Sequence, residues 1–156
     1  MDTSLIEGYV SPAAYLRPDG VEILKRNAEV AIVPYEQIRA VYFVRDFGEP
    51  PDGDGQKRAF GSRPKLDGLW VRLKFRDGEE VEGVMANDLT LMNEFGVTFT
   101  PPDANAATQR IFVPRKAVEA IKVLGVIGSP VHRRRPRRRA ETSRDQRDLF
   151  SAEQGT

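Results

Sequence analysis

Apolar and polar residues alternate in two stretches of the chain that begin 50 positions apart, at residues 21–30 (VEILKRNAEV) and 71–80 (VRLKFRDGEE). An alternation with a period of two is typical of a strand that buries one face. In each stretch the alternation ends in polar residues, among them Asn27 and Asp77, which favour turns. Each stretch therefore predicts a strand that leads into a hairpin turn. The alternating apolar residues are Val21 and Ile23 in the first stretch and Val71, Leu73 and Phe75 in the second.

Two further stretches superpose without gaps at an offset of 80 positions, residues 31–44 (AIVPYEQIRAVYFV) and residues 111–124 (IFVPRKAVEAIKVL). In both, a short apolar run ends at a proline, Pro34 or Pro114. Proline fixes its own φ and lacks a backbone donor, so it suits the end of a strand. The residues that follow are enough for one helical turn, and then β-branched and aromatic residues return. Each copy therefore predicts a strand, one tight turn and a final strand.

These pairs of stretches define an internal repeat that predicts an all-β protein. Repeat one comprises residues 1–47 and repeat two residues 69–128, with a connecting loop at residues 48–68 that is rich in Gly, Pro and Asp. The middle of repeat two is 30 residues longer, which predicts an extra hairpin with a long loop. Short, bent strands favour small β-barrels, and repeat one is too short for its own core, so we expect both repeats in one globule. The aromatic residues expected in the core are Trp70, Phe75 and Phe99.

Residues 129–156 differ from the repeats because they contain Pro, Arg and polar residues and almost no core-forming residues. Such a segment cannot offset its ordering entropy by burial, so we expect a disordered tail. The tail has eight arginines and four acidic residues, a net charge of +4, whereas the rest of the chain has −3 within a total of +1. The basic character of the protein is therefore concentrated in the tail.

The composition argues against several classes of function. The chain has no cysteine and a single histidine, His132, so disulfides, thiolate metal sites and histidine catalysis lack their residues. We expect a protein that is not an enzyme and that uses no metal or cofactor. No apolar run approaches the length of a membrane span, and residues 1–10 (MDTSLIEGYV) lack the basic start and apolar stretch of a signal peptide. We therefore expect a cytoplasmic protein without membrane contact.

Two glycines of repeat two, Gly78 and Gly83, stand five positions apart after the alternating strand, before hydrophobic and acidic residues. This spacing resembles the signature of the Sm-like fold, which includes Sm proteins and bacterial Hfq. Residues 113–118 (VPRKAV) stand where Hfq has Val-Tyr-Lys-His-Ala-Ile. The resemblance covers residues 69–128, and more loosely residues 21–44, and it implies two Sm-like or SH3-like barrels. The chain also looks like a family of uncharacterised bacterial proteins with the blocks RPKLDGLWVRLKFRDGE and TPPD…QRIFVPR, which implies no function.

The resemblance to Sm and Hfq proteins implies RNA binding. Asp88 and Asn93 are the nearest matches to the Asp and Asn that hold a base in Sm proteins, each displaced by about one position. Pro114 replaces the tyrosine of Hfq and Lys116 its histidine, so the uridine pocket does not carry over intact. Arg115 and Lys116 are candidates for contacts with the RNA backbone, and the alternative is a solvated turn. Sm-like barrels also associate edge to edge, which implies pairing between the two repeats or a homo-oligomer.

Six arginines occupy a run of seven positions in the tail. Each guanidinium can bind a phosphate through two hydrogen bonds, and such a run binds nucleic acid in a salt-dependent way without sequence preference. The alternative is a solubilising tail. The expected partner is nucleic acid, with RNA and DNA both open. The arginines are Arg133, Arg134, Arg135, Arg137, Arg138 and Arg139.

Leu149 and Phe150 form an isolated apolar pair in the tail. Residues 146–150 (QRDLF) resemble the bacterial sliding-clamp-binding pentapeptide, which runs Gln, any residue, Ser or Asp, Leu, then Phe or Leu. Gln146 and Asp148, together with the apolar pair, fill its four restricted positions. The alternative function is therefore an adaptor that docks on the replication sliding clamp.

Overall fold

The computed structural model describes residues 4–47, 57–87, 94–102 and 108–128 of the chain. Their regular structure is β-strand apart from single turns of 3-10 helix, so the expected all-β class is confirmed. In chain order the elements are β1 (Gly8–Tyr9), β2 (Leu16–Arg17), β3 (Gly20–Lys25), β4 (Val30–Val33), η1 (Tyr35–Gln37), β5 (Val41–Val44), β6 (Gly68–Phe75), β7 (Glu80–Met85), β8 (Gly96–Phe99), β9 (Thr108–Pro114), η3 (Arg115–Ala117) and β10 (Val118–Ile127).

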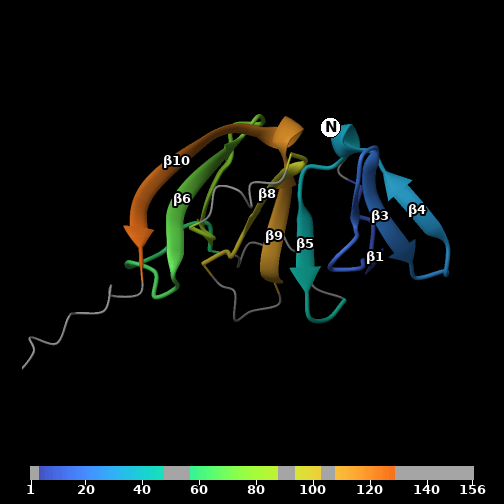
Figure 1. The fold of residues 1–156 in the computed structure, drawn as a ribbon, viewed down its shortest axis with the longest axis horizontal. Coiled ribbons are helices and arrows are strands. Elements are labelled where there is room, and N and C mark those ends of the chain that lie inside the picture. The colour runs from blue at the N-terminus through green and yellow to red at the C-terminus, as the bar shows by residue number, and fades with distance from the viewer. Residues whose placement is uncertain (1–3, 48–56, 88–93, 103–107, 129–156) are drawn as a thin grey trace, which may run out of the picture.

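The strands pair into three open antiparallel sheets (Figure 1). In the first, β3 pairs with β1, β2 and β4. In the second, β6 lies between β10 and β7, and in the third, β9 lies between β5 and β8. Val84 of β7 and Thr100 after β8 exchange two backbone hydrogen bonds of 2.9 Å, which link the second sheet to the third. Among the described residues no sheet closes on itself, so the expected closed barrels are not formed there.

The hairpin turns expected after the two alternating stretches are confirmed between β3 and β4 and between β6 and β7. Asn27 Oδ1 accepts a hydrogen bond of 3.1 Å from the backbone N–H two residues later, and Asp77 Oδ1 accepts one of 3.0 Å in the same way. The next residue in each turn, Ala28 or Gly78, has a positive φ of 66° or 91°. The two repeats therefore form the same turn with different residues.

The second expected pattern, a proline followed by one tight turn and a strand, is also confirmed. Pro34 has φ −60° and ψ 143° and precedes η1, and Pro114 has φ −58° and ψ 143° and precedes η3. In this extended conformation each proline ends a strand and starts the single turn of 3-10 helix. The turn η1 then leads to β5, and η3 leads to β10.

The repeats share a sheet because β5, the last strand of repeat one, pairs with β9 of repeat two. Successive side chains of a strand point to opposite faces, and β9 is buried on both. Ile111 and Val113 belong to one core, whereas Phe112 belongs to a second core with Val21 and Tyr35. The strand β9 is therefore the wall between two cores. The other buried members of the first core are Leu69, Val71, Leu73, Phe75, Met85, Val97 and Phe99.

In the longer middle of repeat two, where an extra hairpin with a long loop is expected, β8 pairs antiparallel with β9. The strand β8 packs closely on β7: the ring of Phe99 in β8 lies so near Gly83 of β7 that a Cβ on this glycine would overlap it. Phe75 and Phe99 are buried in the first core, as expected. Trp70 is only half-buried, with its ring edge-on to Phe60 at a centroid distance of 6.3 Å. Its indole therefore fixes part of the connecting loop against the sheet.

Candidate functional site

Arg115 and Lys116, the candidate backbone contacts, lie on η3. The backbone N–H of Arg115 donates to the carbonyl oxygen of Phe95 at 2.9 Å, and the Arg115 side chain is exposed. Lys116 Nζ forms an ion pair with Glu36 of η1. Glu36 and Lys116 are 80 positions apart, which is the repeat offset. Equivalent turns of the two repeats therefore contact each other through opposite charges.

The ion pair with Glu36 makes the ammonium group of Lys116 less available to a phosphate. The hydrogen bond from Lys116 lowers the pKa of Glu36, so this carboxylate is ionised at neutral pH and faces the ammonium directly. Arg115 instead lines an open groove of about 340 Å³ between β8 and the start of β10. Of the two candidates, Arg115 is better placed to meet a phosphate group.

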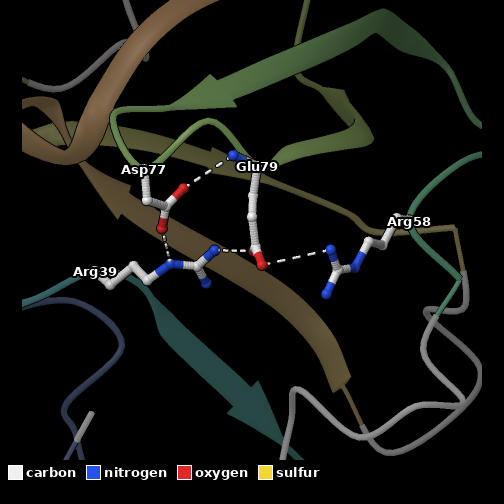
Figure 2. Close-up of polar contacts among 4 residues, drawn as sticks. All are labelled: Arg39, Arg58, Asp77 and Glu79. Atoms are coloured by element: carbon white, nitrogen blue, oxygen red, sulfur yellow. Dashed lines mark hydrogen bonds and ion pairs between the residues drawn. The ribbon is translucent and has the colours of Figure 1, made fainter. Parts of the chain in front are cut away.

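A second cluster, which the sequence analysis did not identify, joins repeat one to the β6–β7 turn (Figure 2). We call Arg39, Arg58, Asp77 and Glu79 the Arg39 cluster. Arg39 Nε donates to Asp77 Oδ2 at 2.7 Å, and Arg39 Nη2 donates to the carboxylate of Glu79. Arg58 Nη1 lies 3.5 Å from Glu79 Oε1. The Arg39 guanidinium also stacks over the ring of Phe75, 4.4 Å from its centroid.

The charges of the Arg39 cluster balance one another. Burial lowers the pKa of Arg39, but the hydrogen bond to Asp77 and the charges of Asp77 and Glu79 outweigh this effect, so the pKa is raised. The hydrogen bond from Arg39 in turn lowers the pKa of Asp77. The hollow beside the cluster measures about 40 Å³, far below the roughly 300–1,000 Å³ that is typical of small-molecule sites. The cluster is therefore a connection between the repeats and offers no room for a small-molecule ligand.

Glu82 of β7 is a buried carboxylate, and the sequence analysis did not identify it either. It accepts hydrogen bonds from Phe60 N at 3.1 Å, Trp70 Nε1 at 3.1 Å and Arg72 Nη2 at 2.8 Å. Burial raises the pKa of Glu82, but the hydrogen bonds from these donors, that from Arg72 most of all, lower it by more. The pKa of Glu82 is therefore lowered overall. A carboxylate that is held ionised by three donors is a poor general base. Its role is to fasten the connecting loop to β6 and β7.

The sequence contained a signal for one of these contacts. Residues equidistant from a hairpin turn face each other, and Arg72 and Glu82 are such a pair in the β6–β7 hairpin. The Arg39 cluster gave no comparable signal, because Arg39 and Asp77 are 38 positions apart in different repeats. In the described part of the chain, no group of three or more His, Cys, Asp or Glu residues could hold a metal ion.

Most of the candidate residues lie outside the described residues, so their contacts stay predictions. No helix within residues 4–47, 57–87, 94–102 or 108–128 is long and apolar enough to cross a membrane. The candidates outside these ranges are Asp88, Asn93, Arg133, Arg134, Arg135, Arg137, Arg138, Arg139, Gln146, Asp148, Leu149 and Phe150.

Comparison with known proteins identifies a family but no function. A protein-family model described as a family of unknown function (DUF6982) matches residues 1–125, which include repeat one and all but the last three residues of repeat two. No curated protein and no solved structure matches the chain.

Proposed function

The chain belongs to DUF6982, a family of unknown function, and we propose that it is a non-enzymatic binding protein that contacts nucleic acid through its tail. In this proposal the two repeats are a scaffold, and the arginines of residues 133–139 bind the phosphate backbone. The proposal includes a cytoplasmic location, where nucleic acid is accessible.

The observation that carries this proposal is the pairing of cations with carboxylates in the folded part. Many lysines and arginines of the described strands and turns form ion pairs, so their charges are largely neutralised locally. A phosphate would have to displace a carboxylate to reach them. The pairs are Arg17–Glu22, Lys25–Glu29, Arg26–Glu7, Arg39–Asp77, Arg39–Glu79, Arg58–Glu79, Arg72–Glu80, Arg72–Glu82, Lys74–Glu119 and Lys116–Glu36.

The sequence of the tail presents the opposite arrangement. Residues 133–139 contain six arginines and no acidic residue. Closely spaced guanidinium groups attract a polyanion and release its counterions, which is the main source of binding without sequence preference. The distribution of charge along the chain therefore favours contact through the tail, with Arg115 as an additional contact on the folded part.

We propose an Sm-like fold for repeat two on the order of its elements. The hairpin β6–β7 is followed by β8 and β9, then by the turn η3, and the last strand β10 pairs back on β6. The two backbone hydrogen bonds between Val84 and Thr100 support a continuous path of strands from β10 to β9. Under this proposal RNA is the first ligand to test, with DNA beside it.

The test is fluorescence anisotropy of labelled single-stranded RNA and DNA with nuclease-treated protein over a series of salt concentrations. We expect the full chain to bind, and a chain that ends at Gly128 to lose most of its affinity. If all six arginines meet phosphates, the log–log salt slope on a single strand is about −4. Replacing the six arginines by glutamine should flatten this slope, whereas replacing them by lysine should keep it.

Unchanged affinity after truncation would contradict contact through the tail. The site would then lie in the folded part, and Arg115→Gln against Lys116→Gln would be the next comparison. Equal binding by the glutamine and lysine variants would show that phosphate neutralisation is not the source of affinity. Tighter binding of RNA than of DNA by the full chain at one salt concentration would identify RNA as the ligand.

The second candidate is an adaptor on the bacterial sliding clamp, which the match of residues 146–150 to the clamp-binding pentapeptide favours. Burial of Leu149 and Phe150 would contribute roughly 1.5–3 kcal/mol each, part of it lost to ordering of the peptide. A micromolar dissociation constant, about −8 kcal/mol, is therefore expected.

This candidate is tested with a peptide of residues 143–156 and purified sliding clamp. The double variant Leu149→Ala/Phe150→Ala should lose binding, whereas Arg147→Ala, at the unrestricted position of the motif, should bind like the wild type. Equal binding by the wild type and the double variant, or binding by neither, would exclude the adaptor function.

A further inference from the structure

The strands β10 and β4 lie at opposite ends of the molecule (Figure 1). Both expose apolar side chains. Among the described residues β10 pairs only with β6, and β4 pairs only with β3, so each has one edge without a partner strand there. Val123 of β10 is 55% exposed, and on β4 Val30 is 63% and Ile32 44% exposed. Unpaired edges with apolar side chains favour association with another strand.

The internal repeat shows how such edges fit together. The strand β5 follows the proline turn of repeat one, and it pairs antiparallel with β9, which precedes the proline turn of repeat two. At the repeat offset of 80 positions, β10 is the equivalent of β5 and β4 is the equivalent of β9. The two edges that have no partner strand among the described residues are therefore the equivalents of the two edges that pair within the chain.

This equivalence fixes a register. Within the chain Val41 faces Phe112 and Phe43 faces Arg110. A shift of the first pair by the repeat offset of 80 gives Ile121 facing Ile32. Two residues further along the antiparallel strands, Val123 then faces Val30. The register derived from the repeat alone thus places the exposed Val123 opposite the most exposed valine of β4. The register was derived without the exposed fractions of the side chains, so the match between two exposed valines supports it independently.

We propose that β10 of one copy of the chain pairs with β4 of a second copy, antiparallel and in this register. The contact is heterologous, because it joins two different edges, so every dimer keeps one free β4 and one free β10. Copies can then add head to tail until the rotation between them closes a ring, or form an open filament if it does not. In Figure 1 the next copy would extend the molecule along its long axis, beyond β4.

Disulfide cross-linking tests the register directly, because the natural chain has no cysteine. Facing residues of antiparallel strands have Cα atoms about 4.5–5.5 Å apart, within the range that a disulfide spans. A mixture of Val30→Cys and Val123→Cys full-length chains, both free of nucleic acid, should form a disulfide-linked dimer under mild oxidation. Either variant alone should not. Leu5→Cys, at 62% exposure and in neither edge strand, replaces Val30→Cys in the control mixture.

Sedimentation velocity tests the direction of assembly. The average mass of the wild-type chain should rise with concentration, and Val30→Lys or Val123→Lys should each abolish that rise. An equimolar mixture of the two lysine variants should recover association but stop at the dimer, because each variant keeps one intact edge. The single tryptophan, Trp70, reports that the variants are folded. A monomeric wild type at every concentration would overturn the proposal, as would a dimer from Val123→Cys alone or no product above the control mixture.

Discussion

At the scale of single residues, backbone conformation distinguishes glycines that look alike in the sequence. Gly78 has a positive φ of 91°, and a Cβ there would meet no atom within 4 Å. Gly83 has an extended backbone in β7, but a Cβ there would overlap the ring of Phe99. The spacing of these glycines, which carries the resemblance to the Sm signature, therefore reflects one turn and one close approach between strands.

We predict that Gly83→Ala lowers the stability of the protein more than Gly78→Ala does. Gly78→Ala costs about 1 kcal/mol, because alanine is disfavoured at positive φ. Gly83→Ala costs about 1–3 kcal/mol, because β7 and Phe99 must move apart. Ala28→Gly is the matched control, since Ala28 already tolerates a φ of 66°, and its effect should be small. Urea unfolding followed by fluorescence measures all three, and equal losses for both glycines would contradict the prediction.

Glu82 provides a prediction of pH dependence. Its pKa is lowered in the folded protein, so its contribution to stability is present above the ordinary pKa of a glutamate, about 4.3, and is lost as the pH falls through the lowered value. Glu82→Gln should cost about 1–3 kcal/mol at neutral pH. The difference between wild type and variant should shrink in acid. Urea unfolding at several pH values, read from the Trp70 signal, measures it, and a difference that does not change with pH would show that the charge of Glu82 is not the source of the stability.

At the scale of elements, the Arg39 cluster connects the strands of repeat one to the β6–β7 turn. Arg39 precedes β5, which crosses from repeat one into the sheet of β9 and β8. Two carboxylates and the Phe75 ring hold its guanidinium on three sides. The cluster therefore positions the start of β5 for its pairing with β9.

We predict that Arg39→Ala destabilises the protein by about 1–3 kcal/mol, since it removes charged hydrogen bonds and a cation–π contact. Arg39→Lys should recover little of this loss, because an ammonium cannot bind two carboxylates and stack on a ring at the same time. A double-mutant cycle of Arg39→Ala with Glu79→Ala, read from urea unfolding at low and high salt, measures the coupling between the two. A coupling near zero at low salt would show that the cluster contributes no stability.

At the scale of the whole molecule, β9 makes the two repeats interdependent. Phe112 is fully buried in the core that contains Val21 and Tyr35 of repeat one, whereas its neighbours Ile111 and Val113 fill the core of repeat two. The ring of Tyr15 packs edge-on against Phe112 at a centroid distance of 5.9 Å. Loss of either core would therefore expose one face of β9.

We predict that the chain unfolds as one cooperative unit. Trp70 fluorescence reports only on repeat two, whereas far-ultraviolet circular dichroism reports on all strands, and their unfolding midpoints should coincide. Phe112→Ala should lower both midpoints together, with a loss of about 3–5 kcal/mol. A variant whose dichroism changes at low denaturant while the Trp70 signal does not would show that the repeats unfold separately.

The sequence by itself determined the local structure of this protein. Alternation predicted the strands β3 and β6, Asn27 and Asp77 predicted their turns, and Pro34 and Pro114 predicted the short turns before the last strands. Each of these depends on neighbouring residues, whose sterics and hydrogen bonds act within a few positions. The expected closed barrels are not formed among the described residues. Alternation predicts that one face of a strand is buried, but it does not predict which strand pairs with it.

Only the tertiary structure decided how the repeats combine. The pairing of β5 with β9, the ion pair between Glu36 and Lys116 and the contacts of Arg39 join residues that are distant in the chain. A contact of this kind depends on the relative position of whole sheets, which the packing of both cores fixes. The sequence therefore determined the strands and turns, whereas packing around β9 decided which of them became neighbours.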